Sequence, residues 1–328
     1  MDNPDNIPQI VIEALQRAMT AAEEVLGTTS PNPPVGAAIL DAAGNLVGVG
    51  ATQPPGGSHA EIMAIAQAGT NTQGGTAVVT LEPCNHTGRT GPCSHAILDA
   101  GITTVYYVHS DPNPVACGGA TWLADRGVQV IQLPGHVPAL RPWLIATRMQ
   151  RPHLTWKTAN TIDGFTAALD GTSQWITGED ARHHAHRDRS KRDAIIVGTG
   201  TYFADNPQLT ARTSEGTLYP HQPRRIVVGR RAVNEPGWEH YPDSDTALTE
   251  LWRTGARDVL IEGGATLATS LLSRGLIDAV HAYIAPAFLG QGLGVVTEAL
   301  GTTITDIRRF TLDSVTRLGD DVLLELAR

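Results

Sequence analysis

The chain has 328 residues, of which 41% are hydrophobic and 17% are charged, and its formal net charge at pH 7 is −9. This length predicts about two domains, and the acidic balance argues against nucleic acid as a partner, because no broad basic surface is available for a phosphate backbone. No apolar run approaches the roughly 18 residues that span a membrane, and the acidic start of the chain is unlike a signal peptide. The cysteines, Cys84, Cys93 and Cys117, are too few for a disulfide framework and favour a reducing, cytoplasmic location.

The first half of the sequence alternates helical and strand patterns. Gly101 marks the C-terminal end of one of the helices. The apolar spacing predicts helices over 10–26, 60–68 and 93–100 and near Leu123, and strands over 35–40, 46–51, 77–81, 105–108 and 128–133. Alternation of this kind predicts a largely parallel sheet between layers of helices, that is, a three-layer α/β sandwich.

The second half begins after two breaks in this pattern, at 133–138 and at Arg151-Pro152. We place the boundary near residue 148, so the expected domains are 1–148 and 149–328. Capping-box spacing from Thr177 to Asp180 predicts a helix that continues to about residue 192. Core strands are expected over 153–158, 194–197, 225–228, 259–262 and 279–284, and two alternating runs, 310–318 and 322–326, predict a closing antiparallel pair.

One constellation in the first half has the residue types of a metal site. His59 and Glu61 stand where a Gly/Pro-rich loop meets a helix, Cys84 follows a strand, and Cys93 opens the next helix. One His and two Cys leave the fourth tetrahedral position of Zn²⁺ open, which is typical of a catalytic site. Zinc lowers the pKa of bound water towards neutrality, and Glu61 lies close enough to move protons. Each residue alone is more simply a buried or solvated side chain, but together they match the H-x-E…P-C…C pattern of zinc deaminases.

The spacing between the two cysteines departs from that pattern, because eight residues separate them instead of two. With this insertion, the Pro-Asn-Pro-Pro run at 31–34 and the Asp-Pro-Asn-Pro run at 111–114, the chain resembles the bifunctional deaminase–reductase family of riboflavin biosynthesis over essentially its whole length. Matching runs in the second half are Asn160-Thr161-Ile162-Asp163-Gly164, Ser173-Gln174-Trp175-Ile176-Thr177, 198–207 and Glu262-Gly263-Gly264-Ala265-Thr266-Leu267. Gly91 stands where the family usually has Pro, and 115–120 is an atypical Gly-rich loop.

The resemblance implies a cytidine-deaminase-like sandwich followed by a dihydrofolate-reductase-like domain that binds NADPH. The implied reactions are hydrolytic deamination of 2,5-diamino-6-ribosylamino-4(3H)-pyrimidinone 5′-phosphate and then NADPH-dependent reduction of the ribosyl chain to ribityl. It also implies small-molecule substrates, no nucleic-acid or membrane partner, and a homo-oligomer, with a dimer favoured.

The same resemblance assigns residues to roles. It implies Zn²⁺ held by His59, Cys84 and Cys93, with Glu61 as the catalytic proton shuttle. Cofactor contacts are implied for Ala159, Trp175, Thr201, Asp205, Gly264, Ala265, Thr266, Leu267, Ala268, Thr269 and Ser270. Substrate contacts are implied for Ser173, Arg189, Leu209, Arg212 and Glu262. Forked guanidinium groups at Arg189 and Arg212 suit a ribose phosphate, although most of the basic residues around Arg189 must simply be solvated.

Other interpretations of these motifs exist. The Gly-x-Gly run at 198–200 lacks the third glycine of a Rossmann fingerprint and is rejected as one. The Gly263-Gly264 turn before a helix is either a phosphate-binding turn or an ordinary tight connection. A second metal at His183, His184 and His186 is disfavoured, since no further ligand type accompanies them. For the whole chain, the alternatives are a nucleoside or tRNA deaminase with an accessory domain, and a paralogue that binds another ligand.

Overall fold

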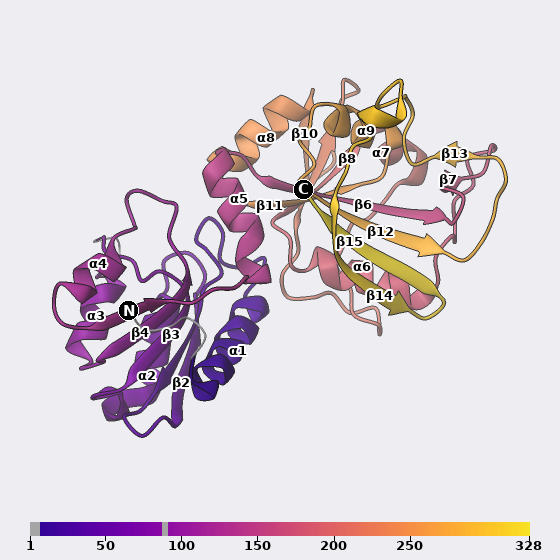
Figure 1. The fold of residues 1–328 in the computed structure, drawn as a ribbon. Helices are drawn as coiled ribbons and strands as arrows, with labels where there is room; N and C mark the ends of the chain where they lie inside the picture. Colours follow the sequence, from indigo (N-terminus) through magenta and orange to yellow (C-terminus); the bar gives the residue numbers. More distant parts are fainter. Residues whose placement is uncertain (1–6, 87–90) are drawn as a thin grey trace. The chain divides into compact units, whose positions relative to one another are not determined.

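The structure is a computed structural model that describes residues 7–86 and 91–328. The chain forms two compact units, Met1–Gln150 and Arg151–Arg328 (Figure 1). Within the described ranges, no helix is both long enough and apolar enough to cross a membrane.

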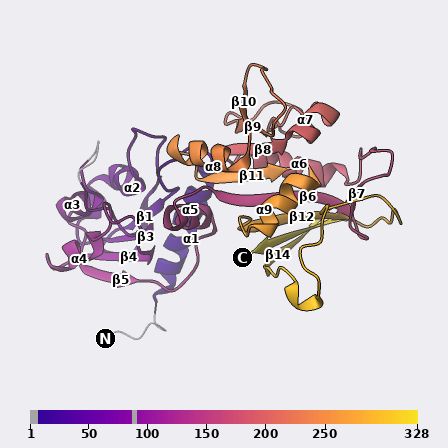
Figure 2. The same ribbon diagram turned by 90° about the horizontal axis from the view of Figure 1, so that it is seen from above.

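The first unit is built on a five-stranded sheet with the strand order β2-β1-β3-β4-β5. Figure 2 shows β1, β3, β4 and β5 lying one after another in this order. The strands are β1 (Gly36–Leu40), β2 (Leu46–Ala51), β3 (Thr76–Leu81), β4 (Thr104–His109) and β5 (Gln129–Gln132). The expected parallel arrangement is confirmed for β3, β4 and β5. β1 runs antiparallel to both β2 and β3. The short turn at 41–45, which joins β1 to β2, requires that these two strands be antiparallel.

Helices cover both faces of this sheet, which confirms the three-layer sandwich (Figure 1). They are α1 (Gln9–Glu24), α2 (Ala60–Ala68), α3 (Cys93–Asp99), α4 (Gly119–Ala124) and α5 (Arg141–Met149), with 3₁₀ turns at Gly69–Thr72 and Pro138–Leu140. A Cβ on Gly36 would lie 1.8 Å from the Ala18 carbonyl oxygen of α1, and one on Gly50 would lie 2.4 Å from the Ala60 carbonyl oxygen of α2. Gly50 pairs with the residue next to Gly36, so the two glycines let α1 and α2 approach from opposite faces.

The second unit is built on an eight-stranded sheet with the order β10-β9-β8-β11-β6-β12-β15-β14. Its strands are β6 (His153–Thr161), β8 (Ala194–Gly198), β9 (Arg224–Val228), β10 (Trp238–Tyr241), β11 (Asp258–Glu262), β12 (Ala279–Ala285), β14 (Thr311–Leu318) and β15 (Asp321–Ala327). In this order, all the strands from β10 through β9, β8, β11 and β6 to β12 are parallel. β15 and β14 then close the sheet as the expected antiparallel pair. A separate ribbon joins β7 (Phe165–Ala167) to β13 (Leu293–Gly294).

Helices lie on both faces of this second sheet as well (Figure 1). They are α6 (Glu179–Arg189), α7 (Thr199–Asp205), α8 (Ser244–Arg253) and α9 (Ala265–Ser273), with a 3₁₀ turn at Ile304–Asp306. Helices α8 and α9 contribute to the largest cluster of buried apolar side chains in the second unit. Helix α6 packs on Tyr283 and Leu323 in a separate, smaller cluster. The capping box predicted from Thr177 is wrong, because Gly178 is the N-cap and makes no side-chain cap. Instead, the Gly178 amide donates to the Asp321 carboxylate at 2.6 Å.

Candidate zinc centre and reductase site

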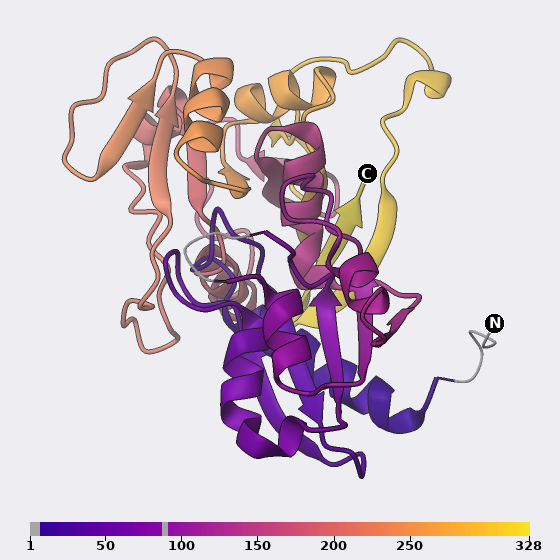
Figure 3. The ribbon, with the colours of Figure 1, turned by 90° about the vertical axis from the view of Figure 1, so that its left-hand side faces the viewer.

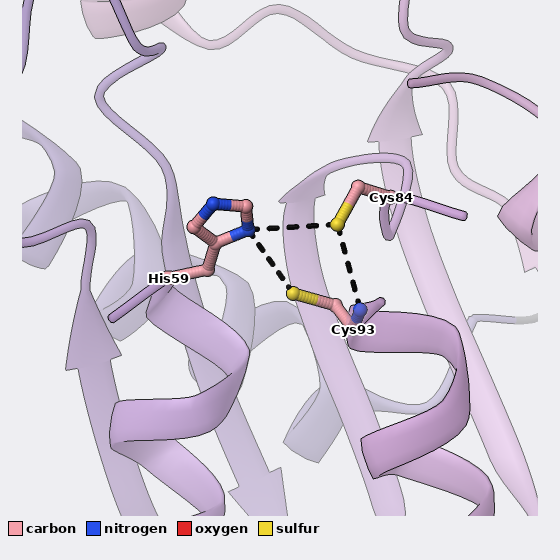
Figure 4. A group of neighbouring side chains, drawn as sticks. All are labelled: His59, Cys84 and Cys93. Carbon is pink, nitrogen blue, oxygen red and sulfur yellow. Dashed lines mark hydrogen bonds between the residues drawn. The ribbon is translucent and has the colours of Figure 1, made fainter. Parts of the chain in front are cut away.

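Three side chains from separate elements of the first unit converge on one point (Figure 4). His59 is the N-cap of α2, Cys84 follows β3 after Glu82 and Pro83, and Cys93 is the first residue of α3. The His59 Nδ1 atom lies 3.3 Å from the Cys93 Sγ atom and 3.5 Å from the Cys84 Sγ atom. Tetrahedral zinc with ordinary Zn–N and Zn–S lengths places N and S about 3.6 Å apart. The donor set and its spacing therefore fit Zn²⁺.

Cys84 and Cys93 are both buried, and their surroundings shift the pKa values of the two thiols in opposite directions. The pKa of Cys84 is lowered to about 4, chiefly by its hydrogen bond with the Cys93 side chain and further by His59. The same bond with Cys84, together with burial, raises the pKa of the Cys93 thiol. Among the described residues, His59, Cys84 and Cys93 are the only group of three or more candidate ligands whose donor atoms lie this close together.

Glu61 lies beside this group in the first turn of α2 and is only 4% exposed. Burial raises the pKa of its carboxyl group to about 7, and the nearby Cys84 adds to this effect. Cys117 is exposed, and its thiol faces the Pro114 carbonyl at 3.6 Å. A Cβ on Gly91 would meet nothing within 4 Å, so the departure at this position makes no steric demand. Within the insertion, residues 87–90 lie outside the described residues.

The second unit brings four of the five expected substrate residues into one cluster. Arg189, at the end of α6, donates from Nε and Nη2 to the two carboxylate oxygens of Glu262, at 2.5 and 2.7 Å. The Nη1 atom of Arg189 also donates to the Thr210 carbonyl oxygen, next to the buried Leu209. Arg212 donates from Nε to the Thr210 hydroxyl at 3.0 Å. The fifth residue, Ser173, is exposed on the loop before α6, and within the described ranges it makes no hydrogen bond to this cluster.

Lys157 belongs to the same cluster and was missed by the sequence analysis. It lies beside Glu262 in the pairing of β6 with β11, and its Nζ atom lies 5.5 Å from the centre of the Tyr283 ring. Burial lowers the pKa of Lys157, although Glu262 opposes this effect. Burial alone would raise the pKa of Glu262, but Arg189 and then Lys157 hold it below its ordinary value. The signal in the sequence was the single lysine among the nine residues of β6.

The carboxyl ends of three adjacent parallel strands, β9, β8 and β11, lie together at one edge of the sheet. A Cβ on Gly263 would lie 2.8 Å from the Thr201 side chain, and one on Gly264 would lie 3.1 Å from the Thr201 hydroxyl. A Cβ on Gly229 would lie 2.4 Å from the Thr199 hydroxyl. Thr201 is thus a neighbour of Gly263 and of Gly264, the N-cap of α9, at an edge where α/β sheets bind ligands.

Three other residues expected to contact the cofactor have different surroundings. Ala159 is half-buried on β6. Trp175 is 70% exposed, and the Arg182 guanidinium lies over its ring at 4.6 Å. Asp205 is the exposed last residue of α7, and in the described part of the chain its carboxylate makes no hydrogen bond. Within the described residues, no hydrogen bond, ion pair or ring contact is found between any two of these three residues.

The three histidines of α6 each contact a different partner. His184 meets the Tyr283 hydroxyl at 2.8 Å, His186 meets the Thr210 carbonyl at 2.9 Å, and His183 lies 3.6 Å from Glu179. Their rings therefore do not converge as the ligands of one ion.

Comparisons with known proteins match both halves. Residues 152–324 match the model of the RibD C-terminal domain, and residues 9–109 match that of the cytidine and deoxycytidylate deaminase zinc-binding region. The riboflavin biosynthesis protein RibD of Corynebacterium ammoniagenes is 56% identical over 91% of this chain and 92% of its own length. The protein of the same name from Mycobacterium tuberculosis is 45% identical over 98% of this chain and 99% of its own.

Solved structures agree over nearly the full length. RibD of Acinetobacter baumannii matches with a TM-score of 0.85 and 31% identity, covering 97% of this chain and 99% of that one. A Thermotoga maritima diaminohydroxyphosphoribosylaminopyrimidine deaminase/5-amino-6-(5-phosphoribosylamino)uracil reductase matches with a TM-score of 0.85 and 30% identity, covering 97% and 98%. These matches favour a two-activity enzyme over a nucleoside or tRNA deaminase with an accessory domain. The chain therefore belongs to the RibD family of riboflavin biosynthesis enzymes, which join a zinc-binding deaminase domain to a reductase domain.

Proposed function

We propose that residues 1–148 deaminate 2,5-diamino-6-ribosylamino-4(3H)-pyrimidinone 5′-phosphate and that residues 149–328 then reduce the ribosyl chain to ribityl with NADPH. The observation that carries the first step is the convergence of His59, Cys84 and Cys93 with the buried Glu61. The second step is supported by the ion pair between Arg189 and Glu262. Glu262 is the last residue of β11 and directly precedes the Gly263-Gly264 turn.

In the deaminase step, His59, Cys84 and Cys93 would hold the zinc. The metal, when bound, supplies the Lewis acidity that lets water act as a nucleophile near neutral pH. Glu61 would take a proton from that water and deliver protons to the ring and to the departing ammonia. Water adds its oxygen to the ring carbon and ammonia leaves, so the reaction is a hydrolysis without any redox change. The position of Glu61, two residues beyond His59 in the first turn of α2, supports this role.

In the reductase step, Ser173, Arg189, Leu209, Arg212 and Glu262 would line the substrate pocket. The guanidinium group of Arg189 is less available to bind a phosphate, because it already donates hydrogen bonds to Glu262 and to the Thr210 carbonyl. Arg212 is half-buried, and among the described residues its side chain bonds only neutral groups of its own loop, the Thr210 hydroxyl, the Gly216 carbonyl and the Gln208 amide oxygen. We therefore assign the sugar phosphate chiefly to Arg212.

For the cofactor, we propose contacts from Ala159, Trp175, Thr201 and Asp205 and from the α9 start, Gly264, Ala265, Thr266, Leu267, Ala268, Thr269 and Ser270. NADPH rather than NADH is supported by Arg230 and Arg231, which the sequence analysis missed. They follow Gly229 at the carboxyl end of β9, and within the described residues neither is paired with a carboxylate. Arg231 lies over the Phe203 ring of α7 at 3.4 Å. In dinucleotide-binding α/β folds, an arginine near the ribose accommodates the 2′-phosphate, and we assign this role here to Arg230 and Arg231.

A homo-oligomer, with a dimer favoured, is supported by the exposed edge of the second sheet. Strand β14 is the outermost strand and is exposed along most of its length, with Leu312 at 54% and Val315 at 59%. Figure 3 shows the C-terminal segment, gold to yellow, running as a long loop before it enters β14. That loop exposes Ile304 and Ile307. An exposed edge strand that carries apolar side chains is a template for pairing, and we propose a second copy of the chain as its partner.

We also propose a cytoplasmic location. Cys84, Cys93 and Cys117 are all free thiols, and unpaired cysteines in a metal site are stable where thiols stay reduced.

The test of this function is a pair of coupled assays on the full chain. With the diaminopyrimidine phosphate alone, we expect release of one ammonia per substrate and no further reaction. With NADPH added, we expect oxidation of one NADPH per substrate and a ribityl product in the mass spectrum. A protein that oxidises NADPH with the deaminated compound but never releases ammonia would contradict the assignment of the first half.

A further inference from the structure

Glu82 is a buried carboxylate that, within the described residues, accepts hydrogen bonds from backbone amides alone. It follows β3 and directly precedes Pro83 and Cys84, and only 8% of it is exposed. Its Oε2 atom accepts from the Asp111 amide at 3.2 Å, and its Oε1 atom accepts from the amides of Gly118 and Ala120 at 3.0 and 3.2 Å. Among the described residues, no lysine or arginine forms an ion pair with it. A buried carboxylate without a cation is stable only when such hydrogen bonds compensate for lost hydration.

These three amides lie at the two ends of residues 111–120, a segment that includes the atypical Gly-rich run 115–120 and is here called the 111–120 loop. The loop packs directly on the turn that carries the first cysteine ligand. A Cβ on Gly119 would lie 1.8 Å from the Pro83 carbonyl oxygen, so only glycine permits this approach. The Asn85 amide donates to the Ala116 carbonyl at 3.0 Å. The loop therefore touches the chain on both sides of Cys84.

The 111–120 loop also reaches the second cysteine ligand. Ala116 is buried in one apolar cluster with Cys84 and Cys93. Asn85, which the loop holds by its backbone, accepts a hydrogen bond from the Ser94 hydroxyl at 2.8 Å, next to Cys93. Glu82 is thus joined through one loop to the backbone beside both thiols.

We propose that Glu82 is a positioning residue of the zinc centre, which acts by tying the 111–120 loop to the turn at Cys84 and so fixes the direction of the Cys84 thiolate. The proposal rests on the ligand assignment made above. The carboxylate is needed because both of its oxygens accept. Glutamine would keep one acceptor and turn an NH₂ group towards an amide N–H, which breaks at least one of the three bonds. Groups that orient metal ligands in this way affect metal affinity or activity by about 10- to 100-fold.

The test compares Glu82→Gln with wild type in the full chain, by zinc release to a chelator and by the absorption of the Co²⁺-substituted protein. Thiolate-to-cobalt bands report the ligand geometry directly and do not depend on turnover. We expect zinc release about 10- to 100-fold faster, a shifted Co²⁺ spectrum, and a lower kcat for deamination with a smaller change in KM. Glu82→Asp, which keeps both acceptor oxygens on a shorter side chain, should rescue part of each effect and also serves as the test variant if Glu82→Gln does not fold.

A matched control is available in the same unit. Asp41 also accepts backbone amides, from Ala43 at 2.9 Å and from Asn45 at 2.8 Å, but it lies in the turn between β1 and β2. Asp41→Asn should leave zinc release and the Co²⁺ spectrum at wild-type values. A folded, zinc-loaded Glu82→Gln protein with the wild-type spectrum and release rate would overturn this proposal alone. A wild-type protein that binds neither zinc nor cobalt would overturn the ligand assignment, and this proposal with it.

Discussion

Arg189 and Glu262 form a two-pronged ion pair, with Nε to Oε1 at 2.5 Å and Nη2 to Oε2 at 2.7 Å, between the end of α6 and the end of β11. Only 16% of the arginine side chain and 7% of the glutamate side chain are exposed. Removing one partner of such a pair leaves a buried charge uncompensated and costs about 3–5 kcal/mol.

We therefore expect Arg189→Met to lower the stability of the second unit by about 3–5 kcal/mol at pH 7, measured by urea unfolding. The double variant Arg189→Met/Glu262→Gln should recover a large part of this loss, because no unpaired charge remains. The folded-state pKa of Glu262 lies below its ordinary value of 4.5. The stabilisation is therefore present above that pH and is lost as the pH falls through the lowered pKa. An Arg189→Met protein as stable as wild type at pH 7 would show that the pair contributes nothing.

Arg212 is expected to affect the reductase substrate without affecting the fold. Its hydrogen bonds to Gln208 and Gly216 are on an exposed loop, so truncation removes little structural support. Loss of charge-assisted hydrogen bonds to a phosphate, each about 1.5–3 kcal/mol, should raise the KM for the deaminated intermediate about 10- to 150-fold. Steady-state kinetics of Arg212→Ala, with zinc content and deamination as internal controls, check this. An unchanged KM would move the phosphate to another part of the pocket.

Arg230 and Arg231 are expected to set the choice between NADPH and NADH. The double variant Arg230→Gln/Arg231→Gln removes two cations from the end of β9 but no ion pair, so the fold should be unaffected. We expect the KM for NADPH to rise by at least about 10-fold, roughly the worth of one charged hydrogen bond, while the KM for NADH stays the same. Arg17→Gln, an exposed arginine on α1, is the control. Equal changes for both cofactors would mean that these arginines do not contact the 2′-phosphate.

Much of the fold could be predicted where apolar periodicity and turn residues agree. The bounds of β2 and α2 match the predicted ranges 46–51 and 60–68. Helix α8 was missed, although Asp243 caps it through the Thr246 amide and Leu248 and Leu251 face the core. The short strands β7, β10 and β13 were missed because two to four residues carry no periodic pattern.

Some residues of the candidate site could likewise be predicted from the sequence, and others could not. The zinc ligands could be predicted because His, Glu and Cys carry their chemistry in their identity and spacing. The role of Glu82 could not, since its partners are backbone amides 29 to 38 residues away. The pairing of Arg189 with Glu262 could not be predicted either, because the partners lie far apart in the sequence and α6 carries many other charged residues. Such contacts depend on how the strands are ordered, and single-sequence patterns do not reveal that order.

The exposed edge strand makes a prediction about assembly. Val315→Lys places a charge on β14, and charged edge residues oppose strand pairing. We expect the variant to shift from dimer to monomer in light scattering at micromolar concentration, with zinc content unchanged. Leu46→Lys, at a comparably exposed apolar site in the first unit, should keep the wild-type mass. A wild-type protein that is monomeric at these concentrations would contradict the proposed pairing.

The central claim is that Glu61 moves the protons of a zinc-dependent deamination, and Glu61→Ala tests it most directly. Zinc content, ammonia release from the diaminopyrimidine phosphate, and NADPH oxidation with the deaminated intermediate are measured on one preparation. We expect about one zinc per chain, deamination reduced by at least about 10²- to 10⁴-fold, and reduction at the wild-type rate. A variant that has lost its zinc, or one that keeps zinc and still deaminates at the wild-type rate, would contradict the account.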